Sequence, residues 1–315
     1  MKYDNPTIKQ AVGTSIRNNY GFDIKRMVFI PVGEESYAYK AIASNGKAYF
    51  AKYCGKPNIV KTINQVNSFL VEIVNKKYVV PPIVSNGNFS FELLEGRVYV
   101  YPYVEGEILT IPNEEFGKSL VNEITNIMAD VHNIDINTVN TILPVEKFDT
   151  KTFIDSYKLL GKPPKAEVQN KVFKELWKKY HKGLGNYIND YVSQGQKYQK
   201  NLPNMVITHG DITGRNIILS EKGMMLVDWD GITLAPREKD LIFYLDNPNF
   251  SIDSYLKLIR QASYQPELAK YYGQRWAIES ILDNFEKLSN AGTADELVKE
   301  YVDEIENYID SRSFK

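Results

Sequence analysis

The chain has 315 residues, enough for one large domain or two moderate ones, and its 38 lysines and arginines nearly balance its 39 aspartates and glutamates. This balance leaves no general basic field and argues against nucleic-acid binding. The only cysteine, Cys54, excludes an intrachain disulfide, the N-terminus has no apolar signal-peptide core, and no run approaches the roughly 20 apolar residues of a membrane span, so we expect a cytoplasmic protein without membrane contact.

The first hundred residues are predicted to form a helix and then a mostly antiparallel sheet. Residues 5–20 carry apolar side chains at helical spacing, and Asn5 before Pro6 is a good helix start. Apolar, β-rich segments follow at 28–30, 37–42, 47–52, 79–84, 89–93 and 97–101. A second helix is expected over 58–75, because its apolar residues line one face.

Most of the remaining chain is predicted to be helical. Asn113 is a suitable N-cap for a helix that continues to His132. Residues 151–200 indicate a helical insertion with stripes of aromatic and aliphatic side chains, which at this spacing usually form core. Residues 251–310 have a helical pattern again. The stretch around residues 206–235 differs, since short apolar strands alternate there with polar loops.

That stretch predicts a hairpin that carries three candidate functional residues. The polar loop 209–215 follows one strand and precedes another, and a turn with Gly223 leads into a third strand that ends at Asp228. Asp211 and Asn216 therefore lie on one loop, and Asp228 lies at the end of a hairpin that returns towards that loop.

These residue types suit phosphoryl transfer, in which an enzyme mostly positions groups and neutralises charge. Asp211 is a candidate for the carboxylate beside the attacking hydroxyl. Asn216 and Asp228 are candidate ligands for Mg²⁺, which prefers one or two carboxylates together with phosphate oxygens and waters. The spacing H-x-D-x-x-x-x-N, followed by an acid after an apolar strand, is that of a kinase catalytic loop. Taken singly, Asp211 could instead cap a turn and Asn216 could be an ordinary loop amide.

The ordered set HGDITGRN at 209–216 and VDWD at 227–230 resembles the aminoglycoside phosphotransferase and choline kinase-like family. The extension LAPREKDL at 234–241 is similar to the spectinomycin phosphotransferase branch. The resemblance implies an α+β, bilobal protein-kinase-like fold. Its small antiparallel-sheet lobe would span residues 1–101, with a hinge at 102–106. A larger, mostly helical catalytic and substrate-binding lobe would span 107–315, including the insertion at about 151–200.

The resemblance also implies a nucleotide site in the small lobe. Lys52 would contact the phosphates, although a surface strand lysine is the alternative. Gly33 and Ser36 lie where the family has its nucleotide-covering loop, and an ordinary turn is the alternative there. At the hinge, the carbonyl of Pro102 would accept from the base and the N–H of Val104 would donate to it. An edge strand broken by proline is the rival interpretation.

One departure from the family concerns the partner of Lys52. The family places a glutamate on the following helix, but spacing from Pro81-Pro82 puts Thr62 or Gln65 at that position. Glu72 is the only acid in the helix, and it projects away from the apolar stripe. The partner of Lys52 is therefore left open.

The remaining candidates have supporting or substrate roles. Asp240 resembles the family's buried acid that holds the catalytic loop, and His209 is expected to be structural as well. Asp230 is a candidate for metal or substrate binding. Glu279 and Asp283, one helical turn apart, could bind a cationic substrate, with solvated surface acids as the alternative.

The sequence thus predicts an O-phosphotransferase that uses ATP or GTP with Mg²⁺ and acts on a small hydroxylated molecule, as a monomer or homodimer. The family resemblance offers an aminoglycoside or aminocyclitol antibiotic as acceptor, and antibiotic resistance as the consequence. One alternative is a metabolic kinase of the choline, homoserine or thioribose type. Another is a non-catalytic kinase-like binding or spore-coat protein.

Overall fold

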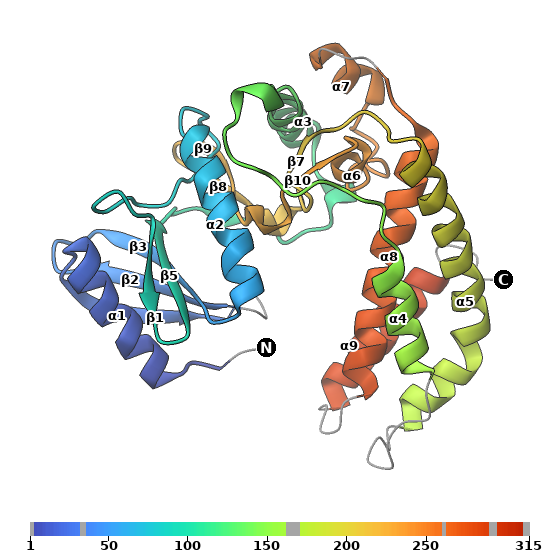
Figure 1. Ribbon diagram of the computed structural model, residues 1–315, viewed down its shortest axis with the longest axis horizontal. Coiled ribbons are helices and arrows are strands. Elements are labelled where there is room, and N and C mark those ends of the chain that lie inside the picture. The colour runs from blue at the N-terminus through green and yellow to red at the C-terminus, as the bar shows by residue number, and fades with distance from the viewer. Residues whose placement is uncertain (1–2, 32–35, 162–170, 260–262, 290–294, 311–315) are drawn as a thin grey trace. The chain divides into compact units, whose positions relative to one another are not determined.

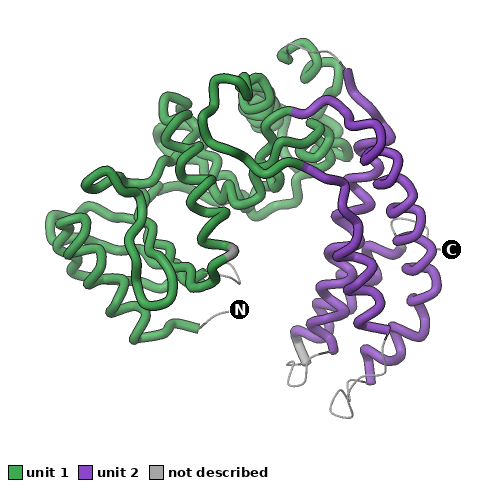
Figure 2. Tube along the Cα trace, in the orientation of Figure 1, with its two compact units in different colours: residues 1–145, 206–262 green, residues 146–205, 263–315 purple. Residues whose placement is uncertain are grey.

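The computed structural model describes residues 3–31, 36–161, 171–259, 263–289 and 295–310 (Figure 1). The chain divides into two compact units (Figure 2). Unit 1 comprises residues 1–145 and 206–262, and unit 2 comprises residues 146–205 and 263–315. Within the described ranges, none of the helices combines the length and the apolar character needed to cross a lipid bilayer.

Unit 1 begins with helix α1 (Pro6–Tyr20) and a five-stranded sheet of order β1-β2-β3-β5-β4. The carboxamide oxygen of Asn5 accepts hydrogen bonds from two N–H groups of the first turn of α1, which confirms the expected helix start. Every neighbouring pair of strands is antiparallel. The strands are β1 (Ile24–Ile30), β2 (Tyr37–Ala43), β3 (Ala48–Cys54), β4 (Ser90–Leu93) and β5 (Gly96–Pro102).

The two faces of this sheet have different partners. On one face, Val12 and Ile16 of α1 pack into a core with Tyr39 and Ala51. Strand alternation places Lys52 on the opposite face, where helix α2 (Pro57–Glu72) contributes Ile63 to a second apolar cluster. The sheet thus isolates Lys52 from the α1 core.

The segment 79–84 does not form the strand that the sequence predicted. Val79 makes only an isolated bridge to Leu226, and Ile83 donates a single backbone hydrogen bond to Val100. The physical reason is the pair Pro81-Pro82, because proline has no N–H to donate to a strand ladder.

The remainder of unit 1 carries the hairpin loops. The elements are β6 (Glu107–Ile108), α3 (Lys118–His132), β7 (Val206–Thr208), β8 (Ile217–Ser220), β9 (Gly223–Leu226), β10 (Thr233–Ala235), α6 (Glu238–Leu241) and α7 (Ile252–Leu258). They form one small sheet of order β6-β8-β9 and one ladder of β7 with β10. Strand β7 leads directly into the loop 209–216, and the residue that follows β9, Val227, donates its N–H to the carbonyl of Asn216 in this loop.

Unit 2 is helical, with α4 (Lys151–Leu160), α5 (Lys171–Lys200), α8 (Pro266–Ser289) and α9 (Asp295–Asp310). The predicted aromatic stripes largely form its core: Phe173 and Tyr191 of α5 are buried, and Tyr191 stacks on Tyr271 of α8 with ring centroids 4.5 Å apart. A chain that combines a five-stranded antiparallel sheet with mainly helical segments has the α+β fold class that the sequence predicted.

Candidate active site

The catalytic-loop sequence sits on a hairpin whose register brings its key residues together. Ile217 of β8 pairs with Leu226 of β9, and the N–H of Val227 donates to the carbonyl of Asn216 at 2.9 Å. The turn at Gly223 has φ 107°, which favours glycine. The backbones of Asn216 and Asp228 are therefore neighbours across the hairpin, as the sequence predicted.

Asp228 has an unusual backbone that its surroundings impose. Its φ of 58° and ψ of 59° are left-handed, a conformation that costs a non-glycine residue about 1 kcal/mol or more. The following Trp229 is buried, donates its indole N–H to Leu226 and packs against the His209 ring. This packing fixes the turn that presents the Asp228 side chain.

The side chains of Asp211 and Asn216 are joined directly. The Nδ2 of Asn216 donates to the backbone oxygen of Asp211 at 2.8 Å and to its Oδ2 at 2.9 Å. In this orientation the Oδ1 of Asn216 remains a candidate oxygen ligand for a cation. The Oδ1 of Asp211 is buried with no hydrogen-bond partner, and burial raises the pKa of this carboxyl. An unpartnered buried acceptor is costly in a resting protein, so it indicates a place for a ligand donor.

Asp240 holds the backbone at the start of the loop 209–216. Its Oδ2 accepts from the N–H of His209 at 2.8 Å, and its Oδ1 accepts from the N–H of Gly210 at 2.7 Å. His132 of α3 lies 3.1 Å away through Nε2, and its Nδ1 is 2.6 Å from the hydroxyl of Tyr255. Burial alone would raise the pKa of Asp240, but these hydrogen bonds and the nearby histidines lower it below its usual value.

His209 makes the contacts of a structural residue. Its Nε2 lies 3.1 Å from the carbonyl of Val227, and its Nδ1 accepts from the N–H of Asp211 at 3.3 Å. These partners require the tautomer with a proton on Nε2. Burial lowers the pKa of the imidazole, so it is neutral at pH 7.

Lys52 meets two of the predicted acids. Its Nζ is 2.6 Å from Oδ2 of Asp230 and 3.4 Å from Oδ1 of Asp228, and its side chain is only 15% exposed. Burial would lower the pKa of this ammonium, but attraction to Asp228 and Asp230 prevails and raises it. The cation that the resemblance assigned to phosphate binding therefore lies beside the metal-ligand candidate.

Among the side chains of α2 that the structure describes, no acid or amide pairs with Lys52. Glu72 accepts from the N–H groups of Asn140 and Thr141 at 2.6 and 2.8 Å. Gln65 donates to the carbonyl of Ile142 at 2.9 Å. The structure thus shows the same departure from the family pattern as the sequence, since no glutamate among the described residues of α2 pairs with Lys52. The acids that pair with it, Asp228 and Asp230, follow strand β9 instead.

The other candidates for nucleotide binding lie before β2 and around the end of β5 in the sequence. Gly33 lies outside the described residues. Ser36 is buried immediately before β2. Pro102 ends β5, and within the described chain the N–H of Val104 has no hydrogen-bond partner. Val104 can therefore donate to a ligand.

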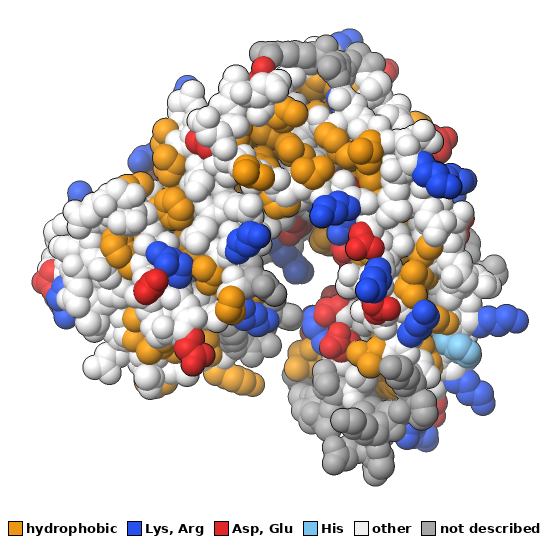
Figure 3. Space-filling view, viewed as in Figure 1, with side chains coloured by type: hydrophobic (Ala, Val, Ile, Leu, Met, Phe, Trp, Pro, Cys, Tyr) orange, Lys and Arg blue, Asp and Glu red, His pale blue; other side chains and the backbone are white. Residues whose placement is uncertain are grey.

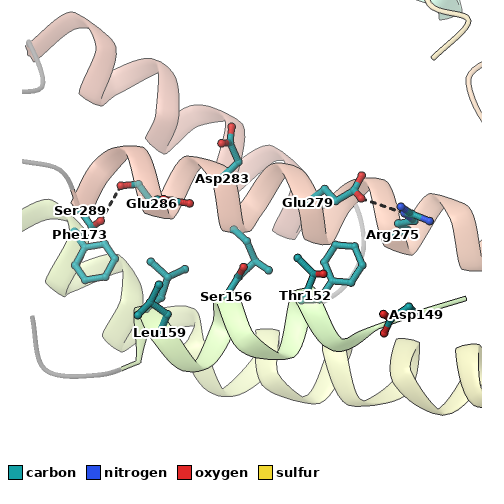
Figure 4. Close-up of a pocket in the computed structure, with 13 residues that line it drawn as sticks. Asp149, Thr152, Ser156, Leu159, Phe173, Arg275, Glu279, Asp283, Glu286 and Ser289 are labelled. Carbon is teal, nitrogen blue, oxygen red and sulfur yellow. Dashed lines mark hydrogen bonds and ion pairs between the residues drawn. The ribbon is translucent and has the colours of Figure 1, made fainter. Parts of the chain in front are cut away.

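Unit 2 contains a separate pocket of about 640 Å³ between α4 and α8 (Figure 4). Asp149, Glu279, Asp283 and Glu286 supply acids to its lining, and leucine and phenylalanine side chains supply apolar surface. Glu279 accepts from Arg275 at 3.1 Å. Figure 3 shows charged side chains interspersed with apolar ones over this part of unit 2.

A family model for the phosphotransferase enzyme family matches residues 27–282. The chain belongs to this family. The prediction of a phosphotransferase is thereby confirmed at the level of the family. Comparison with curated protein sequences gives no match.

The match to solved structures of similar fold covers nearly the whole chain of this phosphotransferase. Spectinomycin phosphotransferase APH(9)-Ia, in complex with ADP and spectinomycin, has a TM-score of 0.76 at 19% identity, covering 96% of this chain and 95% of that one. The GDP and kanamycin complex of APH(2″)-IIia has a TM-score of 0.65 at 12% identity over 95% and 98%. Choline kinase LicA from Streptococcus pneumoniae has a TM-score of 0.58 at 15% identity over 96% and 100%. At these identities the likeness concerns the fold, and it confirms the predicted kinase-like architecture.

Two features of this phosphotransferase were missed in the sequence. Phe50 lies two residues before Lys52 on β3 and hence on the same face of the sheet, which strand alternation could have revealed. Asn67 of α2 is fully buried and accepts from the hydroxyl of Tyr101 at 2.9 Å. No local sequence signal identifies that contact, because it depends on how α2 packs on β5.

Proposed function

We propose that this protein transfers the γ-phosphoryl group of ATP or GTP to a hydroxyl group of a small molecule, with the help of Mg²⁺. The observation that carries the proposal is the arrangement of Asp211, Asn216 and Asp228 on one hairpin, with Lys52 in contact with Asp228. A loose phosphoryl-transfer transition state needs these groups: a carboxylate at the hydroxyl, oxygen ligands for a metal and a cation for the phosphates.

Asp211 is proposed to orient the acceptor hydroxyl and to take its proton. Its Oδ1 is the buried atom without a partner, and Asn216 holds the other oxygen in place. The hydrogen bond from the N–H of Gly210 to Asp240 fixes the backbone that precedes Asp211. A carboxylate held in this way needs little reorganisation when the hydroxyl arrives.

The metal-ligand set proposed here is Oδ1 of Asn216 and the carboxylate of Asp228. The two donors fit Mg²⁺, which uses few protein ligands and keeps positions for phosphate oxygens and waters. A bound Mg²⁺ supplies neutralisation of the phosphate charge. Lys52 adds a second positive charge on the sheet face, and Asp230 lies next to it.

The nucleotide is proposed to bind against the face of the sheet that carries Lys52. Phe50 on this face offers an aromatic surface for the base. Pro102 and Val104 would supply the carbonyl acceptor and the N–H donor for its edge, and the loop containing Gly33 and Ser36 would cover the phosphates. ADP in one structural neighbour and GDP in another leave both ATP and GTP as donors.

The acceptor is proposed to be a hydroxylated molecule that also carries positive charge. Glu279 and Asp283 line an acidic pocket with apolar walls, which suits an ammonium group attached to a carbon framework. Spectinomycin and kanamycin in the neighbouring structures have this chemistry, so an antibiotic acceptor and resistance are the favoured form of the proposal. A metabolic kinase of the choline, homoserine or thioribose type is the alternative, and a non-catalytic binding or spore-coat protein is the second.

The experiment is acceptor-dependent phosphate transfer from radiolabelled ATP or GTP. The panel contains spectinomycin, aminoglycosides, choline, homoserine and thioribose sugars. We expect Asp211→Asn to reduce kcat by about 10²–10⁴-fold and to leave nucleotide affinity unchanged. Asp246→Asn, an exposed change in the same unit, is the matched control. Full turnover by Asp211→Asn contradicts the role of Asp211, and Mg-nucleotide binding with no transfer to any acceptor favours the non-catalytic alternative.

A further inference from the structure

The acids that pair with Lys52 are Asp230 and Asp228, whereas the kinase pattern leads one to expect a glutamate on α2. The Lys52–Asp230 contact of 2.6 Å joins residues 178 positions apart, from β3 to the turn after the hairpin. The longer contact to Asp228, at 3.4 Å, is the weaker of the two. Both acids thus reach the lysine, but Asp230 makes the close hydrogen-bonded pair.

The side of α2 that faces the sheet carries amides instead of a carboxylate. Oδ1 of Asn64 accepts from the hydroxyl of Tyr99 at 3.0 Å, and Oδ1 of Asn67 accepts from the hydroxyl of Tyr101 at 2.9 Å. The helix is therefore attached to β5 by two amide–tyrosine hydrogen bonds. Its only acid, Glu72, binds backbone N–H groups of residues 140 and 141.

These two observations indicate different roles for Asp228 and Asp230. Asp228 is proposed as a metal ligand, and a carboxylate bound to a metal has less charge left for a lysine. Asp230 has no hydrogen-bond partner other than Lys52 among the described residues. Since the lysine side chain is largely shielded from solvent, a close carboxylate restricts its position more than one at the open surface would.

We propose that Asp230 is the positioning residue for Lys52, in place of a glutamate on α2. Asp230 holds the ammonium at the end of β3 so that it meets the nucleotide phosphates, and the position of the lysine depends on the catalytic hairpin and not on α2. This proposal rests on the proposed function, since it concerns the same phosphate site.

The first test measures turnover in the holoenzyme with Mg²⁺ and nucleotide. We expect Asp230→Asn to lower kcat by about 10²-fold, the order of loss that a misplaced group causes, and to leave the Mg²⁺ concentration for half-maximal rate within twofold. Asp230→Glu should recover much of kcat. Glu72→Gln is the matched control on α2 and should keep the wild-type kcat. A tenfold rise in the half-maximal Mg²⁺ concentration for Asp230→Asn would indicate that Asp230 is a metal ligand. Loss of kcat in Glu72→Gln would indicate that the acid of α2 positions Lys52. Either result overturns the proposal.

The second test needs no turnover and remains informative if no acceptor is found. Thermal melting without metal or nucleotide is compared for Lys52→Met, Asp230→Asn and the double variant. If Asp230 acts through Lys52, Asp230→Asn lowers Tm in the wild-type background and not in the Lys52→Met background. The same loss of Tm in both backgrounds overturns the pairing. A coupled pair in a protein that transfers no phosphate would instead contradict the proposed function alone.

Discussion

Replacing Asp240 by asparagine isolates the contribution of one buried carboxylate to the catalytic loop. Both of its oxygens accept backbone N–H groups, from His209 and from Gly210. An asparagine has only one acceptor oxygen, so its NH₂ group must face one of these donors whichever way the amide turns. The side chain is 1% exposed, and water cannot relieve the donor–donor contact.

The magnitude follows from the size of the disrupted network. Breaking a buried, hydrogen-bonded charge network by removing one partner costs about 3–5 kcal/mol. At roughly 2–4 °C per kcal/mol for a unit of this size, Asp240→Asn should lower Tm by roughly 6–20 °C. We also expect kcat to fall, because the backbone that carries Asp211 is released.

The dependence on pH has a definite sign. The folded-state pKa of Asp240 lies below its ordinary value of 3.8, so the ionised carboxylate stabilises the fold. This contribution is complete above the ordinary pKa and is lost as the pH falls through the lower folded-state value. The difference in Tm between wild type and Asp240→Asn should therefore be constant from about pH 5 to 8 and should shrink only below about pH 4.

Melting curves followed by circular dichroism, with Asp246→Asn as the exposed control, measure both effects. A Tm for Asp240→Asn within about 2 °C of that control would refute the reasoning. The network would then contribute less than about 1 kcal/mol to the free energy of unfolding. A Tm difference that changes between pH 6 and 8 would also refute it, because the titrating group would then be another residue.

The remaining predictions concern the glycine at the loop and the acid of unit 2. At Gly210 (φ 89°) an added Cβ would lie 2.2 Å from the carbonyl oxygen of Gly231, whereas at Gly223 (φ 107°) it would meet open space. In unfolding experiments Gly223→Ala should lower the free energy of unfolding only by the backbone strain, about 1–2 kcal/mol. Gly210→Ala should lower it by more and should also reduce kcat. Equal losses of stability in the two variants would contradict the close approach of Gly210 to Gly231. Glu279→Gln should raise KM for a cationic acceptor about tenfold or more and leave KM for the nucleotide unchanged, with the exposed Glu300→Gln as control; an unchanged acceptor KM would remove Glu279 from acceptor binding.

The convergence of Asp211, Asn216 and Asp228 was predictable because it is local. All three lie within 18 residues, and a strand-turn-strand pattern with a glycine at the turn is enough to fold them back on one another. The fold class was implied by the family that this motif resembles, and the structure and the family match confirm it.

The partner of Lys52 was not predictable in this way. It lies on a turn 178 residues away, and no periodicity connects β3 with that turn. The amide–tyrosine contacts of α2 also depend on how the helix packs on β5, which spacing from Pro81-Pro82 cannot reveal. The failed strand at 79–84 is different, because the two prolines already argued against it in the sequence.

The most direct test of the central claim is a crystal structure with a non-hydrolysable nucleotide analogue and Mn²⁺ in place of Mg²⁺, with the metal located by its anomalous scattering. The account predicts a metal bound to Oδ1 of Asn216 and to the carboxylate of Asp228 at roughly 2.0–2.2 Å, with the nucleotide phosphates between this metal and Lys52. A metal and nucleotide bound away from both Asn216 and Asp228 would contradict it.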